Sequence, residues 1–204
     1  MLTKLNQTAA ALAARGFEPH VFESAKDAAA FVLDLAPEGA LVAVGGSMTV
    51  KDLGLADALR AKGHEVLWHW EAPADQKAAV LARAMHADLY LASANALTES
   101  GVIVQIDGTG NRVAAQTFGP KTVCLIVGKN KLVCGGVPQA TARIKSVACP
   151  LNARRLGLDT PCAKTGKCNS GECTRSMCSV TASFERAPGG RRFLVLLVDE
   201  DLGY

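Results

Sequence analysis

Short apolar runs and amphipathic segments alternate along most of the chain. The apolar runs, bounded by polar or glycine-containing segments, are typical of buried strands. The segments between them place apolar residues three or four positions apart, as on one face of a helix. The expected extended segments are residues 18–22, 40–44, 65–70, 87–92, 102–106, 122–127 and 193–198. The expected helices are an amphipathic N-terminal helix and residues 25–35, 50–62, 74–85 and 138–155.

This alternation predicts an α/β fold with a mostly parallel, open, twisted sheet that carries helices on both faces. A chain of 204 residues is long enough for one domain with a well-buried core. Within that domain, residues 1–39 form an N-terminal helical part, and residues 157–181, which are rich in cysteine, form a loop appended to the C-terminal half. Pro150 falls inside the last expected helix and predicts a kink or an early end near Cys149.

Composition and charge narrow the classes of function. Hydrophobic residues make up 49% of the chain and aromatic residues only 5%, and the net charge of +3 comes from scattered Lys and Arg. Neither a stacking surface nor a basic run indicates a nucleic-acid partner. The N-terminus lacks a secretory pattern, and no apolar stretch is long enough to cross a bilayer, so we expect a cytoplasmic protein with no membrane partner. The sequence leaves the formation of a homo-oligomer open.

Three apolar runs between residues 87 and 131 each end in a dense polar or glycine-rich loop. A structural turn needs a glycine or an Asn, but not this density of polar and charged side chains. In an open α/β sheet, the loops at the carboxyl ends of the strands meet at one edge, where ligands bind. We therefore interpret residues 91–131 as the floor of a small-molecule site.

An earlier loop, Gly45-Gly46-Ser47-Met48-Thr49, follows an apolar strand and precedes a helix. Such a loop exposes backbone N–H groups at a helix N-terminus, where a phosphate or carboxylate is stabilised. Its spacing matches neither the Walker loop nor the Rossmann fingerprint. The alternative is a tight turn in which Ser47 or Thr49 caps the helix.

The loops before and after residues 102–106 combine carboxylates, amides and a guanidinium. Glu99 and Asp107 are candidates for a general base and acid if the fold brings them together, and Arg112 could hold a carboxylate or phosphate. The alternative is a hairpin turn at Asp107, a solvated Glu99 and an Arg112 that pairs with one of the two. The candidate ligand-binding residues of these two loops are Asn95, Thr98, Asn111 and Arg112.

The third loop, Gly128-Lys129-Asn130-Lys131, follows the strand 122–127. Lysines beside a glycine at a strand end can close over an anion, and Asn130 and Lys131 are the candidate ligand-binding residues here. The alternative is that both side chains are solvated.

Four cysteines, Cys162, Cys168, Cys173 and Cys178, occur in a segment too polar to pack a core of its own. Zinc or an Fe–S cluster bound by the four thiols would order such a loop, although no two are spaced C-x-x-C. Redox-active thiols are a second interpretation, since Lys164, Lys167 and Arg175 would lower thiol pKa values, and inert thiols are a third. The remaining cysteines, Cys124, Cys134 and Cys149, lie in or beside apolar runs, as buried free thiols do, which argues against a disulfide framework.

Seven motifs, in this order, resemble the LUD-domain family of lactate utilisation proteins: GGSMT, SANALTESG, IDGTGNR, FGP, VGKNK, PLNARR and TPCAKTGKC. The resemblance covers roughly residues 40–204. It implies a fold like that of ribose-5-phosphate isomerase, glucosamine-phosphate deaminase and the CoA transferases. It also implies a role in the oxidation of L-lactate to pyruvate beside larger partner proteins that carry Fe–S clusters.

Three functions follow as expectations. The first is a component of lactate utilisation that binds a small organic acid, or its phosphorylated or CoA-linked form. In it, Gly45, Gly46, Ser47 and Thr49 supply donors, and Glu99 or Asp107 acts as acid or base. The second is an isomerase or transferase acting on a sugar phosphate or an acyl-CoA, by analogy of fold alone. The third is a non-catalytic assembly or electron-transfer partner that uses the cysteine segment.

Overall fold

The computed structural model describes residues 1–169, 173 and 176–204. Arg175, one of the three basic residues expected beside the cysteines, lies outside the described residues. The part of the chain that is described contains no helix long and apolar enough to cross a membrane.

The predicted α/β fold is confirmed. Six parallel strands form an open sheet in the order β1-β10-β7-β4-β2-β3. Five of them fall on the apolar runs of the sequence, and β1 falls on the extended segment expected at residues 18–22, whose sequence is mixed. Their bounds are β1 Glu18–Phe22, β2 Leu41–Val44, β3 Glu65–Trp68, β4 Leu89–Ala92, β7 Thr122–Gly128 and β10 Arg192–Val198.

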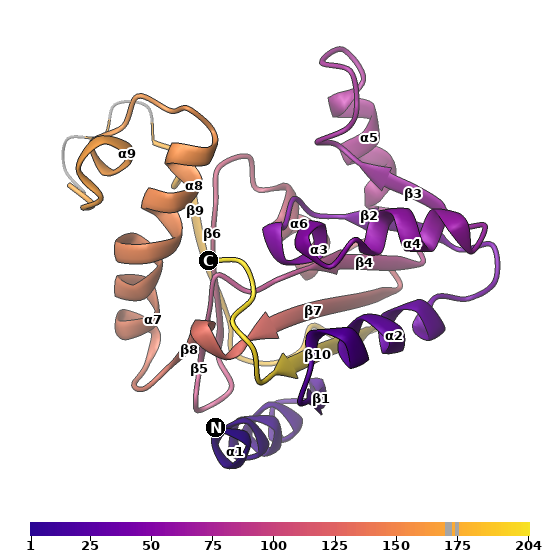
Figure 1. The fold of residues 1–204 in the computed structure, drawn as a ribbon, viewed down its shortest axis with the longest axis horizontal. Coiled ribbons are helices and arrows are strands. Elements are labelled where there is room, and N and C mark those ends of the chain that lie inside the picture. Colours follow the sequence, from indigo (N-terminus) through magenta and orange to yellow (C-terminus); the bar gives the residue numbers. More distant parts are fainter. Residues whose placement is uncertain (170–172, 174–175) are drawn as a thin grey trace.

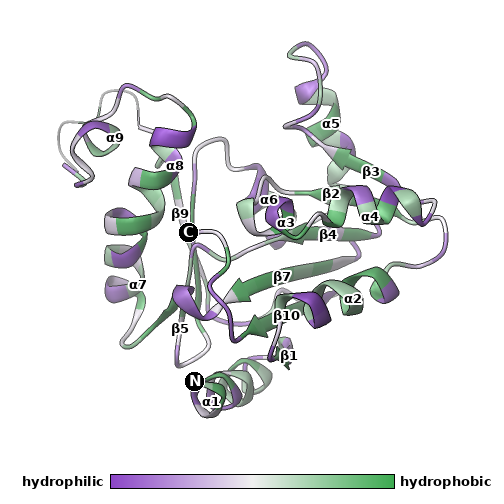
Figure 2. Ribbon diagram, in the orientation of Figure 1, coloured by the Kyte–Doolittle hydropathy of each residue, from purple (hydrophilic) through white to green (hydrophobic). Residues whose placement is uncertain are grey.

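Helices cover both faces of this sheet because alternate residues of each strand point to opposite sides. On one face, Tyr90, Leu125 and Val195 pack with α1 (Leu2–Ala14), α5 (Lys77–Ala84) and α6 (Asn111–Thr117). On the other face, Leu91, Ile126 and Leu196 pack with α2 (Ala25–Leu35), α3 (Met48–Asp52) and α4 (Leu55–Ala61). Figure 1 shows the helices on either side of the sheet, and Figure 2 shows that the strands are hydrophobic along their length.

A second sheet, not expected from the sequence, has the strand order β8-β5-β6-β9. Its strands are β5 Ala96–Thr98, β6 Ile103–Asp107, β8 Leu132–Val133 and β9 Val180–Phe184. The run at residues 102–106 is therefore a strand, but β6 pairs antiparallel with β5 and β9 instead of joining the large sheet. Apolar side chains line both sides of β6, so its pattern does not distinguish the two sheets. The carboxyl end of β6 nevertheless reaches the same region as the ends of β2, β4 and β7.

Two expected helices differ from the structure. The segment 50–62 is divided into α3 and α4 at Gly54, whose φ of 63° lies in the left-handed region and interrupts the helix. Helix α6 occupies residues expected to be a loop, and it begins directly after Gly110. Its start was missed because the polar cluster 107–112 resembles a turn.

The long helix expected over 138–155 does not end at Cys149. It runs from α7 (Val137–Arg143) through a π-helical turn (Ile144–Ala148) into α8 (Cys149–Arg155). Pro150 lies at the beginning of α8, where its missing N–H follows the wide π turn. The helix packs on the second sheet through Ile144, Ala148 and Cys149. The cysteine-rich segment contains a further short helix, α9 (Pro161–Thr165).

The turn between β5 and β6 is packed against α1. Glu99 accepts a hydrogen bond from Lys4 Nζ at 2.7 Å, and the backbone oxygen of Ser100 accepts one from Arg15 Nε at 2.7 Å. Gly101 has a φ of 83° and lies so close to α1 that a Cβ there would be 2.9 Å from the backbone of Ala11 and Leu12. This turn therefore joins the second sheet to the N-terminal helix.

Candidate functional site

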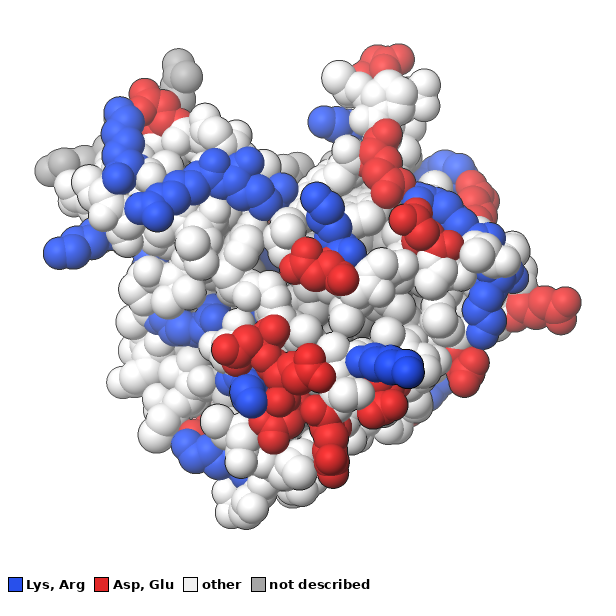
Figure 3. All heavy atoms as spheres, in the orientation of Figure 1, with Lys and Arg blue, Asp and Glu red and all other residues white. Residues whose placement is uncertain are grey.

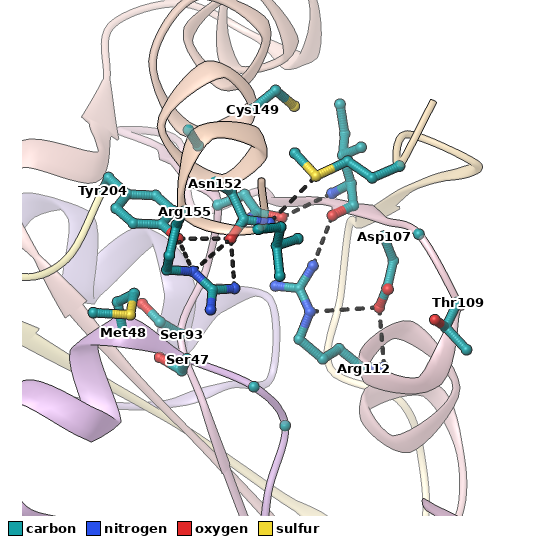
Figure 4. A pocket seen from close by; sticks show the side chains of 18 of the residues that line it. Ser47, Met48, Ser93, Asp107, Thr109, Arg112, Cys149, Asn152, Arg155 and Tyr204 are labelled. Carbon is teal, nitrogen blue, oxygen red and sulfur yellow. Dashed lines mark hydrogen bonds and ion pairs between the residues drawn. The ribbon is translucent and has the colours of Figure 1, made fainter. Parts of the chain in front are cut away.

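A cavity of about 530 Å³ lies between the carboxyl edge of the large sheet, the end of β6 and helix α8. Its walls come from segments far apart in the sequence (Figure 4). They are the loop after β2, the loop after β3, the three residues after β4, the start of α6, the turn after β7, helix α8 and Tyr204. The sequence-based expectation that several strand-end loops converge therefore agrees with the geometry.

The loop after β2 forms one wall by close backbone approach. A Cβ on Gly45 would lie 2.3 Å from the hydroxyl of Tyr90, and a Cβ on Gly46 would lie 3.0 Å from the ring of His69. Ser47 caps α3 by accepting a hydrogen bond from the backbone N–H of Val50 at 3.3 Å. Because α3 spans only five residues, its dipole is small, and the side chains around the cavity dominate its charge.

Lys131 lies at the bottom of the cavity and is only 3% exposed. Its Nζ donates to Ser93 Oγ at 2.8 Å and to Thr49 Oγ1 at 3.0 Å. Burial, together with the nearby guanidinium groups of Arg143 and Arg112, lowers the pKa of Lys131 to about 7. The side chain is therefore poised between its charged and neutral forms near neutral pH.

Asp107 and Arg112 form the opposite wall. The carboxylate Oδ2 of Asp107 accepts the backbone N–H of Arg112 at 3.0 Å and of Val113 at 3.3 Å, so it caps the start of α6. Arg112 Nη2 donates to the backbone oxygen of Ile106 at 2.7 Å, and its Nε lies 3.5 Å from Asp107 Oδ2. The guanidinium is thereby held in place with part of its donor capacity facing the cavity (Figure 4).

A second guanidinium, that of Arg155, comes from α8. Its Nε donates to Tyr204 Oη at 2.9 Å and its Nη2 to Asn152 Oδ1 at 2.8 Å, while Tyr204 Oη donates to Asn152 Oδ1 at 2.6 Å. The guanidinium carbon also lies 4.2 Å from the centre of the Trp70 ring. Four of the lining residues were missed from the sequence: Asn152, Arg155, Trp70 and Tyr204. Asn152 and Arg155 belong to the PLNARR motif, but that motif falls inside an expected helix and not in a strand-end loop.

The lining of the cavity carries an excess of positive charge. Its cationic residues are Lys77, Arg112, Lys131 and Arg155, and its acidic residue is Asp107. On the face of the molecule that Figure 3 shows, by contrast, Lys and Arg occur in separate groups, and Asp and Glu lie among them. The concentration of cations in the cavity is the kind of environment that attracts an anion.

Most of the predicted site residues line this cavity. They are Gly45, Gly46, Ser47, Thr49, Asn95, Asp107, Asn111, Arg112, Lys131 and Cys178. Asn95 also ties the loop after β4 to β6, because its Oδ1 accepts the N–H of Ile106 at 2.9 Å.

Three of the predicted catalytic and ligand-binding residues, and the predicted metal ligands other than Cys178, lie outside the lining of this cavity. Thr98 is fully buried in β5 and its Oγ1 accepts the N–H of Val102 at 2.9 Å, while Glu99 is paired with Lys4 in the turn against α1. The structure therefore does not bring Glu99 to Asp107 as an acid–base pair. Asn130 holds the C-terminal residues, because its Oδ1 accepts the N–H of Leu202 at 3.1 Å and its Nδ2 donates to Gly203 O at 3.2 Å.

His69 lines the cavity from the segment after β3. Its Nδ1 is buried and has no hydrogen-bond partner among the described residues. Burial lowers the pKa of His69, and the charges of Lys77 and Arg112 lower it further, so the ring is neutral near pH 7. A neutral imidazole with a free ring nitrogen can donate to or accept from a ligand.

The described cysteines are free thiols. Cys124 and Cys149 are buried as expected, but Cys134 is exposed, which corrects that expectation. Among the residues the structure describes, no three or more His, Cys, Asp or Glu side chains are grouped so that they could hold a metal ion. The metal or Fe–S site at Cys162, Cys168, Cys173 and Cys178 stays a prediction.

Two thiols on the cavity wall lie close together. Cys149 Sγ of α8 is 3.4 Å from Cys178 Sγ, which precedes β9. The hydrogen bond from Cys149 lowers the pKa of Cys178, and the Lys145 ammonium lowers it as well. An anionic sulfur beside a thiol is the arrangement from which a disulfide forms.

We expect a disulfide oxidant such as oxidised glutathione to link Cys149 to Cys178 with loss of two hydrogen atoms, which leave as the thiols of two glutathione molecules. Peptide mapping by mass spectrometry measures this, and Cys134, which is exposed and in another part of the fold, is the control for unselective oxidation. Oxidation spread evenly over all thiols would contradict the expectation.

Comparisons with known proteins agree with this architecture. In a crystal structure of a DUF162 family protein from Deinococcus radiodurans, 97% of that chain matches 97% of this one, with a TM-score of 0.55 and 15% sequence identity. This likeness supports the open α/β class of fold. No match was found among curated protein sequences. The model of the LUD domain matches residues 5–198, and the chain belongs to the LUD domain family.

Proposed function

We propose that this LUD-domain protein binds a small organic anion in the cavity and serves as a cytoplasmic component of L-lactate oxidation to pyruvate. The observation that supports the proposal is the charge of the cavity, where Arg112, Arg155, Lys77 and a partly protonated Lys131 outnumber the single carboxylate, that of Asp107. Arg112 and Arg155 supply directional donors for a carboxylate. Asp107 caps α6 and orients Arg112, so its role is to position that guanidinium.

The size of the cavity bears on which anion is bound. A volume of about 530 Å³ lies within the range of about 300 to 1,000 Å³ that is typical of sites for drug-sized ligands. A three-carbon acid fills only a small part of this space. The cavity therefore favours a phosphorylated or CoA-linked acid, or an acid together with a second reactant. The same observation supports the second candidate function, an isomerase or transferase for a sugar phosphate or acyl-CoA.

The oxidation of lactate to pyruvate releases two electrons, which need an acceptor. The resemblance to lactate utilisation proteins implies that partner proteins with Fe–S clusters accept them. A cluster or zinc ion on the four C-terminal cysteines would make this chain an electron-transfer or assembly partner instead. Metal analysis and an absorbance spectrum of anaerobically purified protein distinguish these roles. A colourless, metal-free protein contradicts the role of a metal- or cluster-carrying partner.

The test of anion binding is thermal stabilisation by lactate, pyruvate, a sugar phosphate and acetyl-CoA. At a ligand concentration about 100 times Kd, binding adds about 2.7 kcal/mol to the free energy of unfolding. For a domain of this size that raises the Tm by roughly 5 to 10 °C. We expect at least one of these anions to produce such a shift.

Arg112→Ala is expected to abolish the ligand-induced shift, because it removes a fixed guanidinium from the cavity. Each variant is compared with its own Tm without ligand, since Arg112 also bonds Ile106 O. The control is Arg83→Ala, which removes an equal charge from an exposed ion pair with Glu65. The absence of a shift with every anion, or an equal loss in both variants, would contradict the proposed function.

A further inference from the structure

The amine of Lys131 is buried without a close carboxylate partner. Its Nζ contacts two hydroxyl groups, those of Thr49 and Ser93, and among the described residues the opposing charge that acts on it, that of Asp52, has the smallest of the influences on its pKa. A buried ammonium in such surroundings is costly unless it is paired or loses its proton. The side chain nonetheless faces a cavity that is large enough for a ligand.

Both hydroxyls are oriented by their other hydrogen bonds. Ser93 Oγ donates to Ile126 O at 2.6 Å, and Thr49 Oγ1 donates to Leu202 O at 3.3 Å. Because each hydroxyl has one hydrogen, each must act as an acceptor toward Lys131. A neutral amine donates its two N–H groups to these two oxygens, and its lone pair takes part in neither hydrogen bond. The ammonium form would carry a third N–H in addition to these two bonds.

The protonation equilibrium agrees with this geometry. Burial and the charges of Arg143 and Arg112 lower the pKa of Lys131 to about 7, from an ordinary value of 10.5. At pH 7 about half of the molecules then hold a free amine, whereas an unperturbed lysine is neutral in only about one molecule in three thousand. The nucleophilic form is thus available in a large fraction of the protein.

We propose that Lys131 is a nucleophile that forms an imine with a carbonyl compound carrying a carboxylate or a phosphate. This inference rests on the proposed function, because Arg112 and Arg155, which hold the anionic group, also bring the carbonyl carbon to the amine. It adds to that function a covalent step and a class of substrate.

The step balances without an oxidant or a metal. The nitrogen lone pair attacks the carbonyl carbon, a C–N bond forms, and the carbonyl π electrons move to oxygen. The two N–H protons pass to that oxygen, the C–O bond breaks, and the oxygen leaves as water. Thr49 Oγ1 and Ser93 Oγ accept these two N–H groups before the reaction and so orient the amine.

The experiment is reductive trapping with borohydride, which delivers hydride to the imine carbon and makes the adduct permanent. The full-length protein is incubated near neutral pH with pyruvate or with dihydroxyacetone phosphate, so that the two arms distinguish a carboxylate from a phosphate. Intact mass and peptide mapping then locate the adduct. We expect one equivalent, confined to the peptide that contains Lys131, with at least one of the two probes.

The matched control is Lys129→Met, because Lys129 lies two residues earlier and pairs with Asp199 at 3.1 Å outside the cavity. This variant should retain the adduct, and Lys131→Met should lose it.

Thermal stabilisation by the same probes separates the imine proposal from the proposal of anion binding. A probe that stabilises the protein without forming an adduct overturns the imine step and leaves anion binding intact. If neither probe stabilises the protein or forms an adduct, the imine proposal fails, and anion binding is then judged by the other ligands. Adducts spread over several lysines also overturn the imine proposal.

Discussion

Lys131→Met is expected to raise the free energy of unfolding at pH 7, and the advantage of the variant is expected to shrink as the pH rises toward 10. In the folded wild type, burial together with Arg143 and Arg112 lowers the pKa of Lys131 to about 7, against an ordinary value of 10.5. Between these two values the unfolded chain binds a proton that the folded chain does not. Wild-type stability therefore rises with pH across this window, and below it the full cost of the buried charge is present.

The expected effect is large. Each unit of pKa shift corresponds to about 1.4 kcal/mol, so the difference between variant and wild type should change by roughly 3 to 4 kcal/mol between about pH 7 and about pH 10. Methionine has a similar length and no charge. The two hydroxyls keep their carbonyl acceptors, Ile126 O and Leu202 O, after the substitution.

Urea denaturation of both proteins across this pH range measures the effect. Taking the difference between variant and wild type removes the contribution of other groups that titrate in the window. Lys129→Met is the control, and its difference from wild type should vary by less than about 1 kcal/mol because its ion pair with Asp199 is partly exposed. A difference for Lys131→Met that does not depend on pH would mean that the folded protein keeps this amine protonated.

Gly101→Ala is expected to destabilise the protein by roughly 2 to 5 kcal/mol. The left-handed backbone at φ 83° accounts for about 1 to 2 kcal/mol of this. The added Cβ would also lie 2.9 Å from the backbone of α1 at Ala11 and Leu12, and a forced backbone shift adds about 1 to 3 kcal/mol. Helix α1 cannot move away without cost, because Lys4 and Arg15 are hydrogen-bonded to the turn between β5 and β6.

The control for this substitution is Gly39→Ala. Gly39 has a φ of 64°, and a Cβ there would have nothing within 4 Å. The difference between the two variants thus isolates the contact with α1 from the cost of the backbone conformation. Equal losses of unfolding free energy in urea would show that the packing of the turn on α1 contributes nothing.

The sequence predicted the large sheet well because its central strands are continuous apolar runs. Each of Leu89–Ala92, Thr122–Gly128 and Arg192–Val198 is buried on both faces, and such runs are readable without knowledge of the fold. The second sheet was missed for the opposite reason. Its strands β5 and β8 have only three and two residues, too few to show a period, and the partner of β6 is decided by long-range pairing.

The candidate site was predictable only where it follows the strands. Several site residues stand in polar loops after apolar runs, and they meet because the carboxyl ends of those strands lie at one edge of the cavity. They are Thr49, Asp107, Arg112 and Lys131. Arg155 reaches the cavity from the last residue of α8 and was not identified, although it belongs to the PLNARR motif, because a helical pattern does not show which polar side chains meet a ligand. Glu99, which stands in the same kind of loop as Asp107, serves the packing of α1 instead, and composition alone does not separate these two roles.

The π-helical turn at Ile144–Ala148 determines which side of α8 looks inward. Wound as a continuous α-helix, the same residues would place everything beyond the turn about 100° further around the axis, and Asn152 and Arg155 would leave the cavity wall. The wide turn absorbs one residue, because its hydrogen bonds join residues five apart instead of four. A variant that loses one residue here and regains α-helical bonding is therefore expected to keep both side chains inward.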